Sequence, residues 1–179
     1  MANVLDKIIE DKKESLKLIK KSNSLDSLEN KTKEFKAFFD FKEAIQNNKG
    51  ISLITEIKKA SPSAGIIVKD FNHLNIAEKY IKNGATCLSV LTEEKYFLGN
   101  LKQIQDIKKD YKIPILAKDF FIDPYQIALS KSYGCDCILL IISALEGKQI
   151  DEIYSEALKK NLSVIVEVHD QKEAEAALK

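Results

Sequence analysis

Four charged residues stand at the ends of short apolar segments, where a buried strand would meet solvent. Glu56 and Lys58 end the first such segment, while Lys118 and Glu167 end two later ones. Because Glu56 and Lys58 are two residues apart, they lie on the same side of an extended strand. Lysines close to carboxylates in a partly dehydrated site can be tuned as general acids, with a carboxylate as the complementary base. The four residues therefore predict the active site of an enzyme that acts on a small molecule.

An alternative interpretation is that these charges cap helices or lie in solvated loops that merely follow strands. Two other apolar segments end instead at Thr92 and Ser143. In a barrel, alternate strands contribute side chains to the same interior layer, so the first, third and fifth strands would bring the four charges together at the C-terminal mouth. Matching parity at four positions favours the active-site interpretation.

Five short apolar segments alternate with amphipathic segments after residue 50. They are ISLITEI, TCLSVLT, IPILAKD, CDCILLII and LSVIVEV. Runs that are apolar at nearly every position suit strands buried on both faces, and the intervening helices suit parallel crossovers. Such units fit an open doubly wound sheet or a closed (β/α)8 barrel. No glycine-rich phosphate loop follows the first segment, which removes the strongest argument for a nucleotide-binding doubly wound fold.

Two helical segments are predicted before the first strand. Apolar residues at helical spacing indicate one helix from Val4 to about Lys21 and a second from about Lys33 to Gln46. We therefore expect an α/β protein with an N-terminal helical extension at residues 1–48. The strand and helix units of a single domain are expected to follow at residues 49–179. Three of its helices are predicted to end just before a strand, at Gly84, Gly134 and Asn161.

The charge pattern argues against nucleic acid and membranes as partners. The 179 residues include 28 basic and 27 acidic side chains, which are interspersed and create no large field of one sign. Every basic residue is lysine, and without arginine there is no bidentate recognition of phosphates or base edges. No apolar run approaches the roughly 20 residues of a membrane span.

The cysteines indicate a reducing compartment. Cys87, Cys135 and Cys137 lie in apolar, strand-like segments. They lack the C-x-x-C spacing and the paired histidines typical of a metal site, so we expect buried free thiols and no metal. The N-terminus is charged throughout and does not resemble a signal peptide. These features predict a cytoplasmic protein.

Four longer segments carry a more specific signal. They are TEIKKASPSAGII from Thr55 to Ile67, LSVLTEEKYFLG from Leu88 to Gly99, ILAKDFFIDPYQI from Ile115 to Ile127, and VEVHD from Val166 to Asp170. In type, order and spacing they resemble the indole-3-glycerol phosphate synthase family, and the resemblance extends from the N-terminal helices to the last residue. It implies a (β/α)8 barrel of the TIM-barrel type with an N-terminal helical extension.

The resemblance also implies a reaction in tryptophan biosynthesis. The substrate would be 1-(2-carboxyphenylamino)-1-deoxyribulose 5-phosphate, a phosphorylated small molecule. Ring closure, decarboxylation and dehydration would convert it into indole-3-glycerol phosphate, which is the work of a carbon–carbon lyase. No redox or metal cofactor would be needed.

Roles for the four charged residues follow from the same resemblance. Lys118 would be the general acid that protonates the ribulose carbonyl as the anilino ring attacks. Glu167 would assist proton transfers in the dehydration, and Glu56 would hold the lysines and a substrate hydroxyl. Lys58 would either bind phosphate or act in the dehydration.

Three further residues are predicted to bind the substrate. Ser61 lies in the loop after the first strand and would contact the substrate when that loop closes. Phe97 and Phe120 would form walls for the anthranilate ring, although either could equally belong to an ordinary core. His169 is interpreted as a support of the site or as the start of a helix, and it is not in the predicted catalytic set.

The sequence departs from the family pattern in its C-terminal part. A complete barrel has eight strands and usually about 250 residues, whereas about five strand and helix units are predicted here. The residues of the later strands that meet the substrate and its phosphate are not in the sequence. We therefore expect a C-terminally truncated sequence of a whole enzyme, a split gene completed by a second chain, or an inactive remnant. We favour truncation, because no predicted catalytic position in the part that is present has been lost.

Two other functions compete with this prediction. A non-catalytic fragment could bind a partner through its open sheet edge. Another phosphate-binding barrel of aromatic amino-acid metabolism, such as phosphoribosylanthranilate isomerase, would share the fold and the phosphorylated ligand. It would need a different acid–base set.

Overall fold

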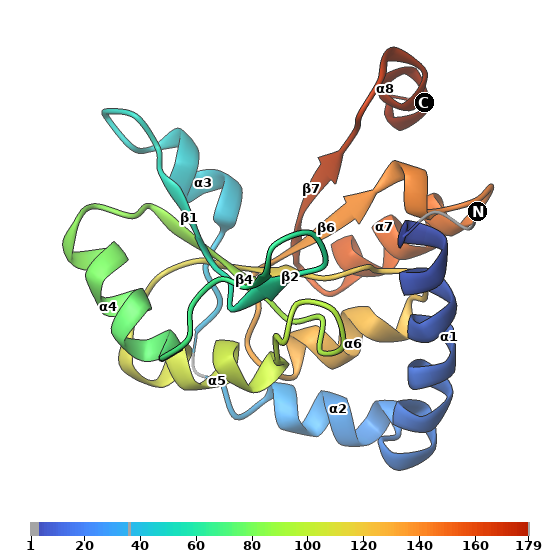
Figure 1. The fold of residues 1–179 in the computed structure, drawn as a ribbon, viewed down its shortest axis with the longest axis horizontal. Helices are drawn as coiled ribbons and strands as arrows, with labels where there is room; N and C mark the ends of the chain where they lie inside the picture. Colours follow the sequence, from blue (N-terminus) through green and yellow to red (C-terminus); the bar gives the residue numbers. More distant parts are fainter. Residues whose placement is uncertain (1–3, 36, 179) are drawn as a thin grey trace.

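The computed structural model describes residues 4–35 and 37–178 and has one five-stranded parallel sheet at its centre (Figure 1). The strands follow the order β1-β4-β5-β6-β7, and each neighbouring pair is parallel. They are β1 (Ile54–Ile57), β4 (Cys87–Leu91), β5 (Ile115–Lys118), β6 (Cys137–Ile141) and β7 (Ser163–Glu167). Each predicted strand segment contains one of them, so these predictions are confirmed. Within the two described ranges, no helix is both long enough and apolar enough to cross a bilayer.

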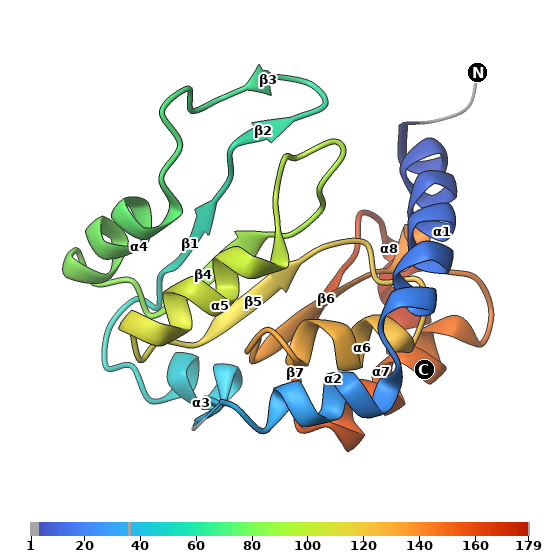
Figure 2. The same ribbon diagram turned by 90° about the horizontal axis from the view of Figure 1, so that it is seen from below.

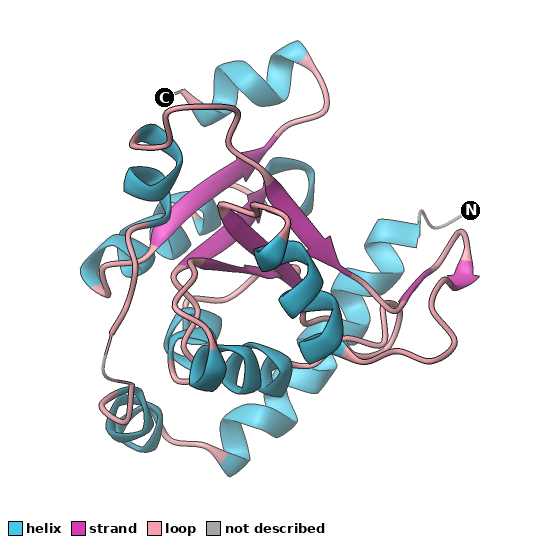
Figure 3. Cartoon of the chain, turned by 90° about the vertical axis from the view of Figure 1, so that its left-hand side faces the viewer, coloured by secondary structure: helices cyan, strands magenta, loops and turns pink. Residues whose placement is uncertain are grey.

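Helices cover the outer side of the sheet, as Figures 2 and 3 show. The crossover helices are α4 (His73–Lys82), α5 (Leu101–Asp110), α6 (Tyr125–Lys131) and α7 (Gln149–Lys159). A short helix, η1 (Ile142–Ala144), follows β6, and α8 (Gln171–Ala177) follows β7. A small hairpin of β2 (Ala60–Ser61) and β3 (Gly65–Ile66) lies between β1 and α4. The arrangement is about five β/α units of a TIM-barrel type of fold, as predicted.

Alternation along the strands separates two hydrophobic clusters. Outward residues such as Leu88, Ile115 and Ile138 pack with the crossover helices. The inner cluster comprises Phe41, Cys87, Leu116, Cys137, Leu139 and Ile141, with Ile165 partly buried against it. Because side chains two residues apart share a face, Lys118 continues the inner row of Leu116, and Glu167 continues that of Ile165.

The buried thiols agree with the prediction. Cys87, Cys135 and Cys137 are free and fully buried. Burial raises the pKa of Cys87 to about 11 and also raises the pKa of Cys137. Burial raises the pKa of Cys135 as well. The reactive thiolate form is therefore disfavoured at all three positions.

The helical extension matches the prediction only in its first half. Helix α1 (Val4–Ser22) confirms the first predicted helix. The predicted helix at 33–46 is wrong, because α2 (Leu25–Thr32) ends before it and α3 (Phe41–Gln46) covers only its last part. The division at residue 48 falls between α3 and β1 and stays a prediction.

Aromatic anchors explain the break between α2 and α3. The Phe35 ring lies so close to Gly134 that a Cβ there would come within 2.5 Å of it. The backbone N–H of Phe39 donates to a buried carboxylate. Asp40 then caps α3 by accepting the N–H of Glu43. The apolar residues at helical spacing therefore belong in part to a non-helical segment that packs against the N-terminal end of the sheet, which we call its base.

The predicted helix ends are confirmed by the backbone. Gly84, Gly134 and Asn161 have φ angles of 88°, 93° and 53°. This left-handed conformation ends α4, α6 and α7 shortly before the next strand.

Asp136 holds the base of the sheet together. Its side chain is completely buried and lies 2.7 Å from the ammonium of Lys108, whose side chain is 3% exposed. The carboxylate also accepts the N–H groups of Phe39 at 2.7 Å and Ile115 at 2.8 Å. Desolvation raises the pKa of Asp136 and lowers the pKa of Lys108, against their mutual attraction. One carboxylate thus joins the helical extension, α5, β5 and the start of β6.

We predict that Asp136→Asn lowers the free energy of unfolding by about 3 kcal/mol, because it leaves the Lys108 ammonium buried without a counter-charge. Urea unfolding followed by circular dichroism measures the change. The exposed Asp110→Asn is the matched control and should change stability by less than about 0.5 kcal/mol. Equal unfolding midpoints for the two variants would contradict the importance assigned to Asp136.

Candidate active site

A cavity of about 310 Å³ opens at the C-terminal ends of the parallel strands. Charged, aromatic and aliphatic side chains share its wall. It is lined by Leu5, Glu56, Lys58, Leu91, Phe97, Lys118, Asp119, Phe120, Leu139, Ile141, Ser143, Glu167 and His169. The four predicted acid–base residues therefore lie around one cavity.

Lys118 and Glu167 meet across an intervening strand. Their side chains leave the ends of β5 and β7, and the Lys118 Nζ lies 3.1 Å from the Glu167 Oε2. Each is about one-third exposed. The neighbouring β6 reaches the same level with Ile141, which is paired with Glu167 in the sheet register. The curvature of the sheet thus brings an ammonium and a carboxylate together over an apolar floor.

Glu56 and Lys58 form a second ion pair at the end of β1. The Lys58 Nζ lies 2.5 Å from the Glu56 Oε1, and both side chains are 34% exposed. The two ion pairs thus contribute two ammonium groups and two carboxylates, whose charges cancel. Such a site can donate and accept protons without a large net charge.

The predicted substrate-binding residues divide into two groups. Phe97 and Phe120 both line the cavity, and their ring centroids lie 6.2 Å apart at an angle of 41°. We call this pair the aromatic corner. Ser61 does not line the cavity, and its Oγ accepts the N–H of Ala64 within the β2–β3 hairpin. The structure therefore brings the two phenylalanines, but not the serine, to the predicted acid–base residues.

His169 is more closely engaged than the sequence suggested. Its Nε2 lies 3.2 Å from the Glu167 Oε1, and its Nδ1 lies 3.3 Å from the Glu173 Oε2. Asp170 caps α8 by accepting the N–H of Glu173. The start of α8 therefore places Glu173 beside the imidazole, which lies between Glu173 and Glu167.

Glu93 was not singled out in the sequence but shapes the loop that carries Phe97. It is only 4% exposed. Its carboxylate accepts the N–H groups of Lys95, Tyr96 and Phe97 at 3.1, 2.6 and 3.0 Å. A buried carboxylate that accepts three backbone donors fixes a short loop. The sequence signal that could have identified Glu93 is its position directly after the apolar segment that ends at Thr92.

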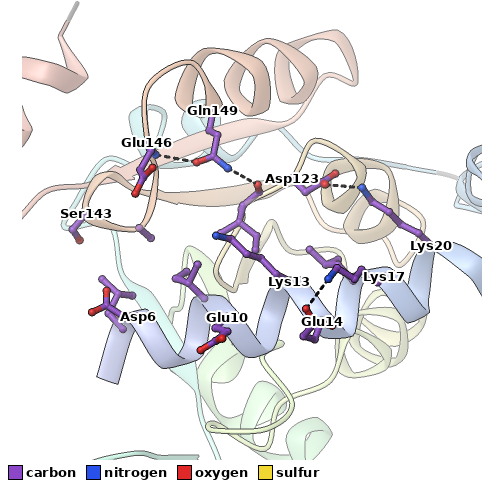
Figure 4. A pocket seen from close by; sticks show the side chains of 15 residues that line it. Asp6, Glu10, Lys13, Glu14, Lys17, Lys20, Asp123, Ser143, Glu146 and Gln149 are labelled. Atoms are coloured by element: carbon purple, nitrogen blue, oxygen red, sulfur yellow. Dashed lines mark hydrogen bonds and ion pairs between the residues drawn. The ribbon is translucent and has the colours of Figure 1, made fainter. Parts of the chain in front are cut away.

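A larger groove of about 740 Å³ lies between α1 and the segments after β5 and β6 (Figure 4). It shares Leu5 and Ser143 with the cavity but contains none of the four predicted acid–base residues. Two ion pairs lie along it, Lys20 with Asp123 and Lys17 with Glu14, each at 2.6 Å. The convergent chemistry lies in the smaller cavity.

Metal ligands do not gather at either place. Among residues 4–35 and 37–178, no group of three or more His, Cys, Asp or Glu side chains is arranged to hold a metal ion. The groups that converge on the cavity are those of acid–base chemistry.

Comparisons with known proteins give one consistent family. A family model described as indole-3-glycerol phosphate synthase matches residues 5–179. The indole-3-glycerol phosphate synthase of Aliarcobacter butzleri (strain RM4018) is 46% identical over 178 residues, covering 98% of this chain and 68% of that protein. The enzyme of the same name from Alkaliphilus metalliredigens (strain QYMF) is 44% identical, with coverages of 98% and 67%. That from Acinetobacter baumannii (strain ACICU) is 42% identical, with coverages of 98% and 65%. The chain thus spans about two thirds of the length of these relatives.

We predict that Glu93→Gln loosens the loop that carries Phe97. The carboxylate has two acceptor oxygens for the three backbone N–H groups, whereas an amide has only one. Hydrogen exchange of residues 94–99 should become at least about tenfold faster, as expected for a loss of about 1.4 kcal/mol of local stability. The exposed Glu94→Gln serves as the control. Unchanged exchange in both variants would show that Glu93 does not order the loop.

Proposed function

This chain belongs to the indole-3-glycerol phosphate synthase family of carboxy-lyases in tryptophan biosynthesis, and we propose that its two lysine–glutamate pairs carry the acid–base steps. The observation that supports this proposal is the convergence of both pairs and the aromatic corner on one cavity. The substrate is proposed to be 1-(2-carboxyphenylamino)-1-deoxyribulose 5-phosphate. Its aromatic ring, its carbonyl and its hydroxyls each need a different kind of partner, and the cavity wall offers apolar, acidic and basic groups.

Ring closure is the first proposed step. The ring carbon that carries the carboxylate attacks the ribulose carbonyl, and the carbonyl electron pair moves to oxygen. Lys118 donates a proton to that oxygen, so a hydroxyl forms instead of an alkoxide. Phe97 and Phe120 hold the ring against the carbonyl, since an aromatic face packs well on phenyl groups. Glu167 keeps the Lys118 ammonium directed into the cavity at 3.1 Å.

Decarboxylation and dehydration complete the reaction. The bond to the carboxylate breaks, carbon dioxide leaves, and its electron pair restores the aromatic ring. The new hydroxyl then leaves as water with a proton from Lys58, while Glu167 accepts the proton released as the indole forms. The enzyme donates two protons and accepts one, so the substrate takes up one proton in total. This is the proton that the reaction consumes when a carboxylate is lost as carbon dioxide.

Other parts of the proposed function concern setting and partners. The cytoplasm is the proposed location, supported by three free buried thiols, which suit a reducing compartment. The phosphorylated substrate is the proposed partner. Each of the relatives is a single chain longer than the matched region, so the comparisons do not support a complementing chain from a split gene.

We predict that Lys118→Ala lowers kcat by about 10²- to 10⁴-fold, the contribution of a positioned general acid. Ligand binding should largely survive, because the aromatic corner is untouched. Indole-glycerol formation is measured in a protein of the relatives' full length that carries this sequence. Lys102→Ala, an exposed position on α5, is the control. Turnover at the wild-type rate in the Lys118 variant would refute the role of Lys118.

Lys58→Met separates the two roles that the sequence leaves open for Lys58. We expect kcat to fall while KM changes little, because Glu56 already engages this ammonium in an acid–base pair at 2.5 Å. A species heavier than the product by one water should accumulate and be visible by mass spectrometry. A rise in KM at unchanged kcat would instead assign Lys58 to phosphate binding.

A further inference from the structure

Helix α1 of the extension reaches the mouth of the barrel. Leu5 lines the cavity, while Ile8 and Leu16 are each only 4% exposed. These positions share one face of the helix at spacings of three and eight residues. Between them lie Asp11 and Lys12, two neighbouring residues of opposite charge. The apolar positions thus fix the helix, and the charged pair faces the loops at the strand ends.

Asp11 binds the loop after β4. Its Oδ2 lies 2.7 Å from the Lys95 Nζ and accepts a hydrogen bond from the Tyr96 hydroxyl. The Lys95 ammonium and the Tyr96 hydroxyl lower the pKa of Asp11, and the carboxylate raises the pKa of Tyr96 to about 12. Tyr96 immediately precedes Phe97, so Asp11 is connected to one side of the aromatic corner.

Lys12 binds the loop after β5. Its Nζ lies 2.6 Å from the Asp119 Oδ1, and the two side chains are only 11% and 10% exposed. The other pairs between α1 and these loops are more open, because Lys95 is 61% and Lys20 42% exposed. Asp119 immediately follows Lys118. This nearly buried ion pair therefore lies next to the proposed general acid.

Asp119 also makes hydrogen bonds that connect it to Phe120 directly and to Lys118 through Thr92. It accepts the N–H of Phe120 and the hydroxyl of Thr92, each at 2.8 Å. The N–H of Thr92 donates to the carbonyl of Lys118 at 3.0 Å. The orientation of Asp119 therefore sets the backbone from which Lys118 and Phe120 project. Thr92, which is 2% exposed, provides the fixed side of this arrangement.

We propose that Asp11 and Lys12 act together as positioning residues that set the width of the aromatic corner and the direction of Lys118. Adjacent residues of one helix hold Tyr96 and Asp119, and each of these directly precedes one phenylalanine of the corner. The helix backbone therefore fixes the separation of Phe97 and Phe120. This inference rests on the proposed function, in which the corner holds the ring during closure.

The opposite signs of the two residues offer a specific test. In the double variant Asp11→Lys with Lys12→Asp, a lysine faces Lys95 and an aspartate faces Asp119, so both contacts become repulsive. Net charge and composition are unchanged. The matched control is Lys13→Glu with Glu14→Lys, an exposed pair on the same helix, in which Glu14 pairs with the exposed Lys17 at 2.6 Å. Both variants are compared with the wild type in a protein of the relatives' full length.

The expected result is a fall in kcat of about 10- to 100-fold in the swapped variant, because misplacing reacting groups by about 1 Å has this effect. KM should change by less than about threefold, and the control should match the wild type. Hydrogen exchange of residues 93–99 and 117–122 should become faster in the swapped variant alone. A kcat within twofold of the control, or unchanged exchange in both loops, would overturn the proposal.

Two further comparisons keep the outcome decisive. If the swapped variant fails to fold, Lys12→Met and Lys12→Arg replace it: Met should reproduce the loss of kcat and Arg should restore most of it. Equal rates for these two variants would overturn the proposal. If the wild type itself shows no turnover, the proposed function fails, while the exchange rates of the two loops still test the positioning by α1.

Discussion

The buried carboxylate of Asp136 is the constraint on which the arrangement depends. It binds Lys108 and the N–H groups of Phe39 and Ile115, and so it joins four segments at the N-terminal end of the sheet. A fully desolvated charge is tolerated only when its partners are all in place. The segment around Phe39 is therefore fixed beneath the sheet. From there α2 and then α1 run along the outside of the molecule to the opposite end (Figure 2). The extension is fastened at both ends of the barrel.

Much of this fold could be predicted because its strongest signals are local. Uniformly apolar runs predict the five strands, and strand parity predicts that Lys118 and Glu167 lie on the inner side. Motif resemblance added the barrel type and the family. The helix predicted at 33–46 failed because apolar periodicity does not distinguish a helix face from aromatic anchors such as Phe35, whose partner Gly134 lies far along the chain. Tertiary contacts overrode the local pattern there.

The contacts that the sequence could not give are those between distant segments. Asp11 meets Tyr96 across 85 residues, and nothing in the pattern of α1 distinguishes its inner charges from its many exposed ones. Asp136 had a signal, since it stands alone between Cys135 and Cys137 in an otherwise apolar run. A lone charge in such a run requires buried partners, but the identity of those partners depends on the folded chain. The partners of a buried polar group are thus harder to predict from sequence than the position of an apolar strand or helix face.

The two charge pairs at the mouth differ in what holds them. Glu56 and Lys58 are on one strand, so their separation depends mainly on local backbone geometry. Lys118 and Glu167 come from strands separated by β6, and their 3.1 Å contact requires the curvature of the whole sheet. Ion pairs that are one-third exposed contribute little to stability, so this contact cannot impose the curvature by itself. The curvature comes from the intrinsic twist of the strands and from the packing on both faces of the sheet, while Asp136 at the base and α1 at the mouth hold the segments at its two ends. Ring closure, which we assign to Lys118, therefore depends on the packing of the whole sheet and not on this ion pair alone.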